Sequence, residues 1–208
     1  MKLTELCSEP LPGGLDLSEE ILIGNDLCGE MPRLVSEHIG PRPLWLADPS
    51  TWNALGEVDL DCKTGRPVGE EGLHLLPGHP HADTEQVGRV CGLVEGGGFS
   101  GIVAVGSGTV NDIAKMAATL SSVPYIAFAT AASMNGYSSG IAAILADGLK
   151  VTVPARPPRA LIMDSNVLAK APPELAQAGL GDHVLFTGPV DNVEDYMRAS
   201  DIFVFPSH

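Results

Sequence analysis

Residues 101–118 constrain the fold of this chain more than any other stretch, because three structural signals follow one another there without a gap. The short apolar run Ile102–Val105 predicts a buried β-strand. A glycine-rich turn, Gly106-Ser107-Gly108-Thr109, interrupts the run. Apolar residues then recur at the spacing of one helix face, at Val110, Ile113, Ala114, Ala117 and Ala118. The stretch therefore predicts a strand, a turn and a helix, as in α/β proteins.

A turn of this kind aims backbone N–H groups and a helix N-terminus at one point, where an anion can bind. Gly106 and Gly108 can adopt positive φ and let a diphosphate approach the main chain, while Thr109 can cap the helix. The full G-x-G-x-x-G spacing is absent. An ordinary strand-to-helix turn without a phosphate therefore stays open as the alternative.

A second strand signal, residues 124–129, also ends in small and polar residues: Thr130, Ser133, Asn135, Ser138 and Ser139. Two strands that both end in such loops form a crevice at the carboxyl edge of a parallel sheet. The alternative is a solvated loop, since Ser and Asn favour turns without any ligand. Asp48 follows a third predicted strand, Pro43–Ala47. This carboxylate either accepts hydrogen bonds from an adenosine ribose or caps a helix over residues 50–55, and both roles are compatible.

The remaining elements alternate in the same α/β manner. We expect strands at residues 20–23, 73–76 and 160–163, helices at 27–38 and 83–94, and another helix from Pro172. The dipeptide Asp147-Gly148 between two apolar runs predicts a β-hairpin over residues 141–153. Asp83 or Thr84 is suited to cap the helix that follows it. His79 and His81 flank a proline, and we interpret them as part of a turn because further metal ligands are lacking nearby.

Composition excludes several classes of partner. The formal net charge of −14 argues against nucleic acid and against anionic membranes, both of which require a basic face. The four cysteines, Cys7, Cys28, Cys62 and Cys91, form no C-x-x-C pair, which favours reduced thiols. Neither a signal peptide nor an apolar run of membrane-spanning length is found. We therefore expect a soluble cytoplasmic protein.

Three motifs carry a resemblance to a known family: Val105–Lys115, Thr130-Ala-Ala-Ser-Met-Asn-Gly-Tyr-Ser-Ser139 and Ala178-Gly-Leu-Gly-Asp182. Over about residues 15–182 the chain resembles the sn-glycerol-1-phosphate dehydrogenases, within the group of iron-containing alcohol dehydrogenases, glycerol dehydrogenases and dehydroquinate synthases. The resemblance implies a Rossmann-like parallel-sheet α/β domain of the dehydroquinate synthase type. It also implies an oxidoreductase of phospholipid biosynthesis, with NAD or NADP as coenzyme and a polyol phosphate as substrate.

The same resemblance assigns roles to individual residues. It implies a coenzyme site made of Asp48, Gly106, Ser107, Gly108, Thr109, Asp112, Thr130, Ser133 and Tyr137. Asn135 and Lys150 would contact the substrate, and Lys150 is equally compatible with an exposed strand position. Asp182 would bind the metal, which is zinc in this branch of the group. The family's other metal ligands come from a helical domain, so we expect the zinc site to be incomplete here, and His183 and His208 match no family position.

Residues from about 175 onward, which include the strand–helix–strand pattern Val184–Phe186, Val193–Ala199 and Ile202–Phe205, resemble the C-terminal domain of a GT-B glycosyltransferase. We accordingly divide the chain into an extension (1–19), an NAD(P)-binding domain (20–178) and a glycosyltransferase-like βαβ fragment (179–208). The primary hypothesis is a truncated and impaired dehydrogenase, which can form homo-oligomers. The alternatives are a fragment related to glycosyltransferases and a nucleotide-binding module without turnover.

Overall fold

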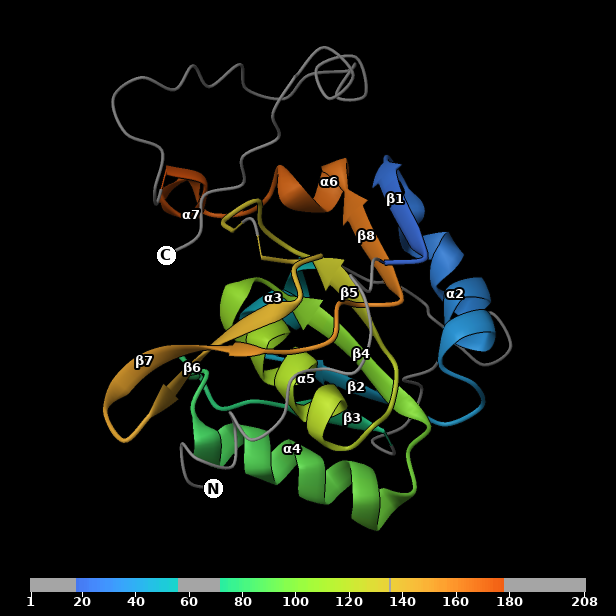
Figure 1. Ribbon diagram of the computed structural model, residues 1–208. Coiled ribbons are helices and arrows are strands. Elements are labelled where there is room, and N and C mark those ends of the chain that lie inside the picture. Colours follow the sequence, from blue (N-terminus) through green and yellow to red (C-terminus); the bar gives the residue numbers. More distant parts are fainter. Residues whose placement is uncertain (1–17, 56–71, 135, 178–208) are drawn as a thin grey trace.

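A computed structural model describes residues 18–55, 72–134 and 136–177, and a six-stranded parallel sheet forms its centre (Figure 1). The strand order is β1-β8-β5-β4-β2-β3. The strands are β1 (Glu20–Gly24), β2 (Pro43–Ala47), β3 (Leu73–Leu75), β4 (Gly101–Gly106), β5 (Tyr125–Ala129) and β8 (Ala160–Asp164). The helices are η1 (Leu27–Glu30), α2 (Met31–His38), α3 (Pro49–Ala54), α4 (Thr84–Gly97), α5 (Gly108–Leu120), α6 (Ser165–Leu168) and α7 (Pro173–Gln177).

Alternation along the central strands divides the apolar core into two layers. On β4, Ile102 and Ala104 pack into one cluster with α4 and α5, whereas Val103 and Val105 pack into a second cluster with α2. Neighbouring strands follow the same alternation, because successive side chains of a strand point to opposite faces. The sheet is therefore covered on both faces, which explains why its strands read as continuous apolar runs. The predicted parallel-sheet α/β fold is confirmed.

The predicted hairpin is also confirmed, as β6 (Ile141–Ala146) and β7 (Leu149–Pro154), which pair antiparallel and lie outside the main sheet (Figure 1). Asp147 and Gly148 connect the strands, and their φ angles of 52° and 79° are those of a two-residue turn with both residues left-handed. Strand β6 contacts α5 and α4. A backbone hydrogen bond from Leu145 N to Ala82 O (2.7 Å) fixes the hairpin to the segment before α4.

Helix α4 begins after Asp83, whose side chain accepts a hydrogen bond from Gln86 N (2.8 Å), so Asp83 is the cap of the two candidates that the sequence offered. The helix ends three residues later than expected, at Gly97, because Gly98 provides a left-handed C-cap with φ of 61°. Gly88, Gly92 and Gly96 lie on the exposed side of this helix, and a Cβ added at any of them would meet no atom within 4 Å.

Gly92→Ala should therefore stabilise the protein, by about 0.5–1 kcal/mol, because alanine loses less conformational freedom than glycine in a helix interior. Gly98→Ala, at the C-cap of the same helix, is the matched control, and it should destabilise the protein because the backbone of Gly98 is left-handed. Urea unfolding followed by circular dichroism measures both. Equal effects of the two substitutions would contradict the helix boundaries.

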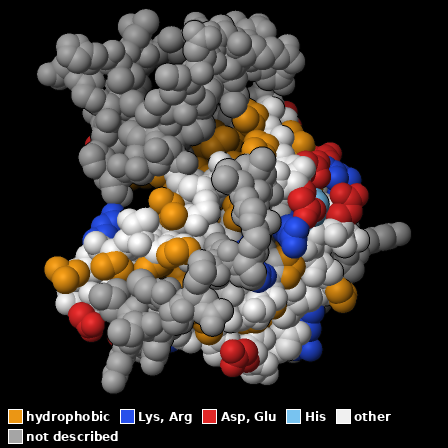
Figure 2. All heavy atoms as spheres, viewed as in Figure 1, with side chains coloured by type: hydrophobic (Ala, Val, Ile, Leu, Met, Phe, Trp, Pro, Cys, Tyr) orange, Lys and Arg blue, Asp and Glu red, His pale blue; other side chains and the backbone are white. Residues whose placement is uncertain are grey.

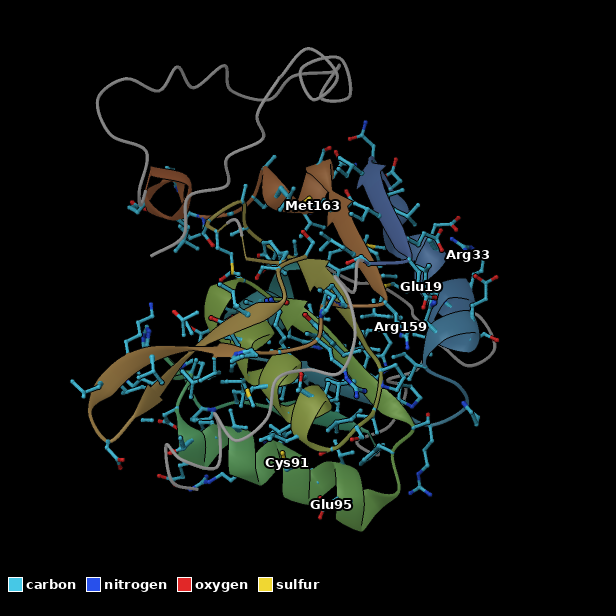
Figure 3. All side chains as sticks on the ribbon, viewed as in Figure 1. Glu19, Arg33, Cys91, Glu95, Arg159 and Met163 are labelled. Atoms are coloured by element: carbon cyan, nitrogen blue, oxygen red, sulfur yellow. The ribbon has the colours of Figure 1, made fainter. Side chains whose placement is uncertain are left out.

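Charged residues gather beside β1 and α2 (Figure 2). Arg33 makes ion pairs with Glu20 (2.6 Å), Glu30 (2.9 Å) and Glu37 (2.7 Å), and Arg159 pairs with Glu19. Figure 3 shows Arg33, Glu19 and Arg159 on this side of the molecule. Among the described residues, Glu20, Glu37 and His38 are the set close enough to share a metal ion, but both carboxylates are already paired with the Arg33 guanidinium. We therefore interpret this cluster as a surface ion-pair network.

Candidate coenzyme site

A cavity of about 870 Å³ lies between the N-terminus of α5, residues 133–134 and 136–139, and the hairpin β6–β7. The turn after β4 supplies Ser107, Gly108 and Thr109 to its wall, and α5 supplies Asp112. The other lining residues are His81, Ala82, Ser133, Met134, Gly136, Ser139, Ile141, Ala143, Leu145, Lys150, Thr152 and Leu175. The cavity therefore unites the two loops that the sequence predicted to meet at the carboxyl edge of the sheet.

The N-terminus of α5 has no side-chain cap among the described residues. Ser107 occupies the N-cap position in extended conformation, and its hydroxyl makes no capping hydrogen bond. The expectation that Thr109 caps the helix is wrong, because the helix already begins at Gly108 and Thr109 lies inside its first turn. Helices α3, α4 and α6 are all capped by aspartate side chains. Free N–H groups of α5 thus face a cavity, and they are suited to bind an anion.

The glycines of the turn provide space, not positive φ, which corrects the expectation for Gly106 and Gly108. A Cβ at Gly106 would lie 2.5 Å from Val110 Cβ, so this glycine allows α5 to pack closely on β4. A Cβ at Gly108 would lie 3.3 Å from Met134 Sδ. Because Gly108 and Met134 both line the cavity, any side chain at position 108 takes up room inside it.

Asp112 lies in the wall of the cavity, where burial raises the pKa of its carboxyl to about 6. Three groups oppose that rise in pKa: the Lys115 ammonium, a hydrogen bond from the backbone of Ala143, and the Lys150 ammonium. Lys150 extends from β7 into the same cavity. The cavity thus combines one carboxylate with a raised pKa and one exposed lysine in addition to the free N–H groups of α5.

Lys115 is a residue that the sequence reasoning quoted but did not assign. Its side chain is 0% exposed, and its ammonium donates to backbone oxygens of residues 136–141. Burial lowers the pKa of Lys115 to about 8, while the nearby Asp112 carboxylate opposes this shift. The signal available in the sequence was its spacing from Asp112, three residues along one face of α5.

The three predicted coenzyme contacts of the second loop, Thr130, Ser133 and Tyr137, are placed differently from one another. Ser133 lines the cavity, as expected for a ligand contact. Thr130 is 5% exposed, and its backbone N–H donates to Gly106 O (3.2 Å). Tyr137 is 2% exposed and does not line the cavity; its hydroxyl donates to Ala131 O (2.8 Å) and lies 3.3 Å from Gly106 O. Thr130 and Tyr137 therefore connect the loop after β5 with the turn after β4, and neither residue lines the cavity.

Asp48 directly follows β2, which lies beside β4, at the same carboxyl edge of the sheet as Gly106. Its Oδ1 accepts hydrogen bonds from Ser50 N (2.8 Å) and Thr51 N (2.9 Å), and Thr51 completes a capping box. The helix-cap role is thus confirmed, whereas the ribose role stays a prediction. Asp48 does not line the cavity described here.

Several sequence predictions fall on residues that the structure does not describe, namely Asn135, Asp182, His183, His208, Cys7, Cys62 and the whole tail from Gly179. Cys28 and Cys91 are free, half-buried thiols, and burial raises the pKa of both, to about 11 for Cys28. His81 lines the cavity, whereas His79 is exposed outside it. Within the described ranges, no helix combines the length and the apolar character needed to cross a bilayer.

A parallel sheet that is covered on both faces, with a glycine turn and an uncapped helix at its carboxyl edge, defines a Rossmann-like α/β fold. A sequence profile described as iron-containing alcohol dehydrogenase matches residues 22–172, and the chain belongs to that family. Among curated relatives, the glycerol-1-phosphate dehydrogenase (NAD(P)+) of Bacillus subtilis strain 168 is 37% identical over 181 residues, which are 86% of this chain and 45% of the relative. The Thermococcus kodakarensis enzyme of the same name is 34% identical over 173 residues, covering 82% and 48% of the two chains.

Solved structures support the same fold. An iron-containing alcohol dehydrogenase from Thermococcus thioreducens superposes with a TM-score of 0.66 at 21% identity, covering 79% of this chain and 50% of the other. A probable glycerol dehydrogenase from Sinorhizobium meliloti also gives 0.66, at 23% identity, with 81% and 45% covered. The chain thus spans about half the length of the relatives it matches. The comparisons give no support to the glycosyltransferase alternative.

Proposed function

We propose that this chain binds NAD(P) and forms the coenzyme-binding part of a dehydrogenase that acts on the CH–OH group of a polyol phosphate. The observation that carries the proposal is the uncapped N-terminus of α5, which opens into a cavity of about 870 Å³. Relatives named glycerol-1-phosphate dehydrogenase support the substrate class. The membership of the chain in the iron-containing alcohol dehydrogenase family supports the coenzyme.

The residues of the turn fit the diphosphate of such a coenzyme. Backbone N–H groups at the start of α5 can donate to the phosphate oxygens, and the helix dipole adds favourable electrostatic energy. Gly108 keeps the entrance clear, because even a Cβ would come within 3.3 Å of Met134 Sδ. The bound nicotinamide would supply the hydride acceptor. Ser133 and Lys150, on two other walls of the cavity, are available to orient the two reactants.

On the substrate side, Lys150 and Asn135 are the proposed contacts. Lys150 is exposed and lines the cavity from β7. Its ammonium is therefore accessible to a phosphate that enters the cavity. Thr152 lies on the same strand, also in the cavity wall, and offers a hydroxyl. The hairpin would thus face the substrate, while the turn before α5 would face the coenzyme.

The described residues do not form a metal site in this cavity. Asp112 and His81 are the potential metal ligands among the described lining residues, and two side chains fall short of the three that a catalytic metal usually receives. The cluster of Glu20, Glu37 and His38 lies outside the cavity and is paired with Arg33. Asp182 remains the proposed ligand for zinc or another divalent metal, outside the described part of the chain.

The experiment that tests the proposal is a titration of NADH fluorescence with the 208-residue chain, repeated in the presence of ADP-ribose. We expect saturable binding that ADP-ribose competes away, because the diphosphate and adenosine half provides the contacts at α5. Absence of saturable binding would refute the proposal, and binding that ADP-ribose leaves unchanged would refute the diphosphate site.

Coenzyme binding should depend on pH through Asp112. The pKa of this carboxyl is about 6 without ligand, and a bound diphosphate nearby should raise it further, since like charges disfavour ionisation. Binding then takes up a proton, so NADH affinity should be highest below pH 6 and should fall as the pH rises through 6 to 8. In Asp112→Asn this dependence should be lost. An identical pH profile in the variant would contradict the position of Asp112 beside the coenzyme.

A further inference from the structure

Lys115 makes an unusual set of contacts for a lysine. It lies in the middle of α5, is 0% exposed, and its ammonium reaches three backbone carbonyls of one segment. The acceptors are Gly136 O (2.5 Å), Ser139 O (3.0 Å) and Ile141 O (3.0 Å). An ammonium has three N–H donors, so three carbonyls use its full capacity. The Ser139 hydroxyl lies 3.2 Å from the same nitrogen and also donates within the segment, to Gly136 O (2.9 Å).

A buried charge of this kind is costly unless it is paired and hydrogen-bonded. A methionine or leucine would fill the same space in the core without that cost. The Asp112 carboxylate, one turn earlier on α5, is the charged group that opposes the effect of burial on Lys115. The contacts of Lys115 therefore indicate a purpose beyond packing, which is to hold the main chain of residues 136–141.

That segment forms part of the cavity. Gly136, Ser139 and Ile141 all line it, together with Ser107 and Gly108 of the turn that precedes α5. Ile141 also begins β6, the strand that continues into the hairpin with Lys150. Lys115 thus joins the helix whose N-terminus faces the cavity to a second segment of the cavity wall.

We propose that Lys115 is a positioning residue that fixes residues 136–141 as a wall of the coenzyme cavity. The consequence for coenzyme affinity rests on the function proposed above, whereas the positioning itself does not. Without the ammonium, three carbonyls would lose their donors and the segment would open to solvent. The core packing of α5 against β4 and β5 would remain, because it depends on other faces of the helix.

Hydrogen–deuterium exchange with mass spectrometry tests the positioning directly, in the absence of coenzyme. Lys115→Met keeps the length and removes the charge, and Lys170→Met is the control, since Lys170 is exposed and outside this network. We expect at least tenfold faster exchange in residues 136–142 of Lys115→Met, with α4 and the central strands unchanged and Lys170→Met like wild type. Unchanged exchange in residues 136–142 would overturn the proposal, and so would uniformly faster exchange throughout the folded chain.

Two further measurements make the result decisive. Ser139→Ala removes a hydroxyl that contacts the Lys115 ammonium and donates to Gly136 O, so it should loosen the same residues to a smaller extent. If Lys115→Met does not fold, this variant decides between support and refutation. NADH affinity, measured well below the unfolding temperature, should fall at least tenfold in Lys115→Met. Equal affinity in wild type and variant would overturn the proposal. If wild type itself binds no NADH, the proposed function fails, and the exchange data alone decide the role of Lys115.

Discussion

Gly108→Leu should reduce NADH affinity by at least two orders of magnitude while leaving the protein folded. A Cβ at position 108 already comes within 3.3 Å of Met134 Sδ, and a leucine side chain would extend further into the cavity. It would occupy the space in front of the N–H groups of α5 and exclude a diphosphate from them. The expected loss corresponds to about 2.7 kcal/mol or more of binding free energy.

Gly92→Leu is the matched control, because Gly92 is likewise a helical glycine but lies on the exposed face of α4 with no atom within 4 Å of an added Cβ. This control should bind NADH as wild type does. Calorimetry with both variants gives the comparison. If Gly108→Leu binds NADH normally and unfolds at the same temperature, the coenzyme does not bind at this turn.

Asp164→Ala should lower the free energy of unfolding by about 2–4 kcal/mol, the largest stability effect that we expect from a single side chain here. Asp164 is 2% exposed at the end of β8. Its Oδ1 accepts from Asn166 N (2.9 Å) and caps α6, and its Oδ2 accepts from Leu27 N (2.7 Å). Removing the carboxylate therefore leaves the backbone N–H groups of Asn166 and Leu27 without their acceptor. The bond to Leu27 joins two segments that lie 137 residues apart in the sequence.

Asp164→Asn separates the two contributions. The amide keeps an acceptor for the cap of α6 but presents an N–H group where Leu27 N requires an oxygen. We expect a loss between zero and that of Asp164→Ala, measured by urea unfolding. If Asp164→Ala changes the free energy of unfolding by less than about 0.5 kcal/mol, its effect equals that of an ordinary surface substitution. That result would contradict the role of Asp164 in holding Leu27 N and Asn166 N.

Much of this fold was accessible from sequence, because its local signals agree with one another. The run 102–105 became a buried strand, Asp83 became a cap, and Asp147-Gly148 became a hairpin turn. The order of strands was not accessible. Strand β8 pairs with both β1 and β5, and such long-range pairing depends on packing between segments that no local pattern records.

The site was only partly accessible for a similar reason. The small and polar residues after two predicted strands indicated that Gly108 and Ser133 lie at one site, and both residues line the cavity. The cap at Thr109 was wrong, because the helix begins two residues earlier, at Gly108, with Ser107 in the N-cap position. The burial of Tyr137 and the role of Lys115 depend on which carbonyls lie opposite them in three dimensions. A sequence shows a hydroxyl or an ammonium, but it does not show its partner.

The central claim is that the coenzyme diphosphate binds at the N-terminus of α5. Amide chemical shifts of the ¹⁵N-labelled chain during an NADH titration test it most directly. The account predicts the largest, saturable shifts at Ser107, Gly108, Thr109 and Val110, whose N–H groups begin the helix. Saturable shifts centred elsewhere, with these four amides unmoved, would contradict it.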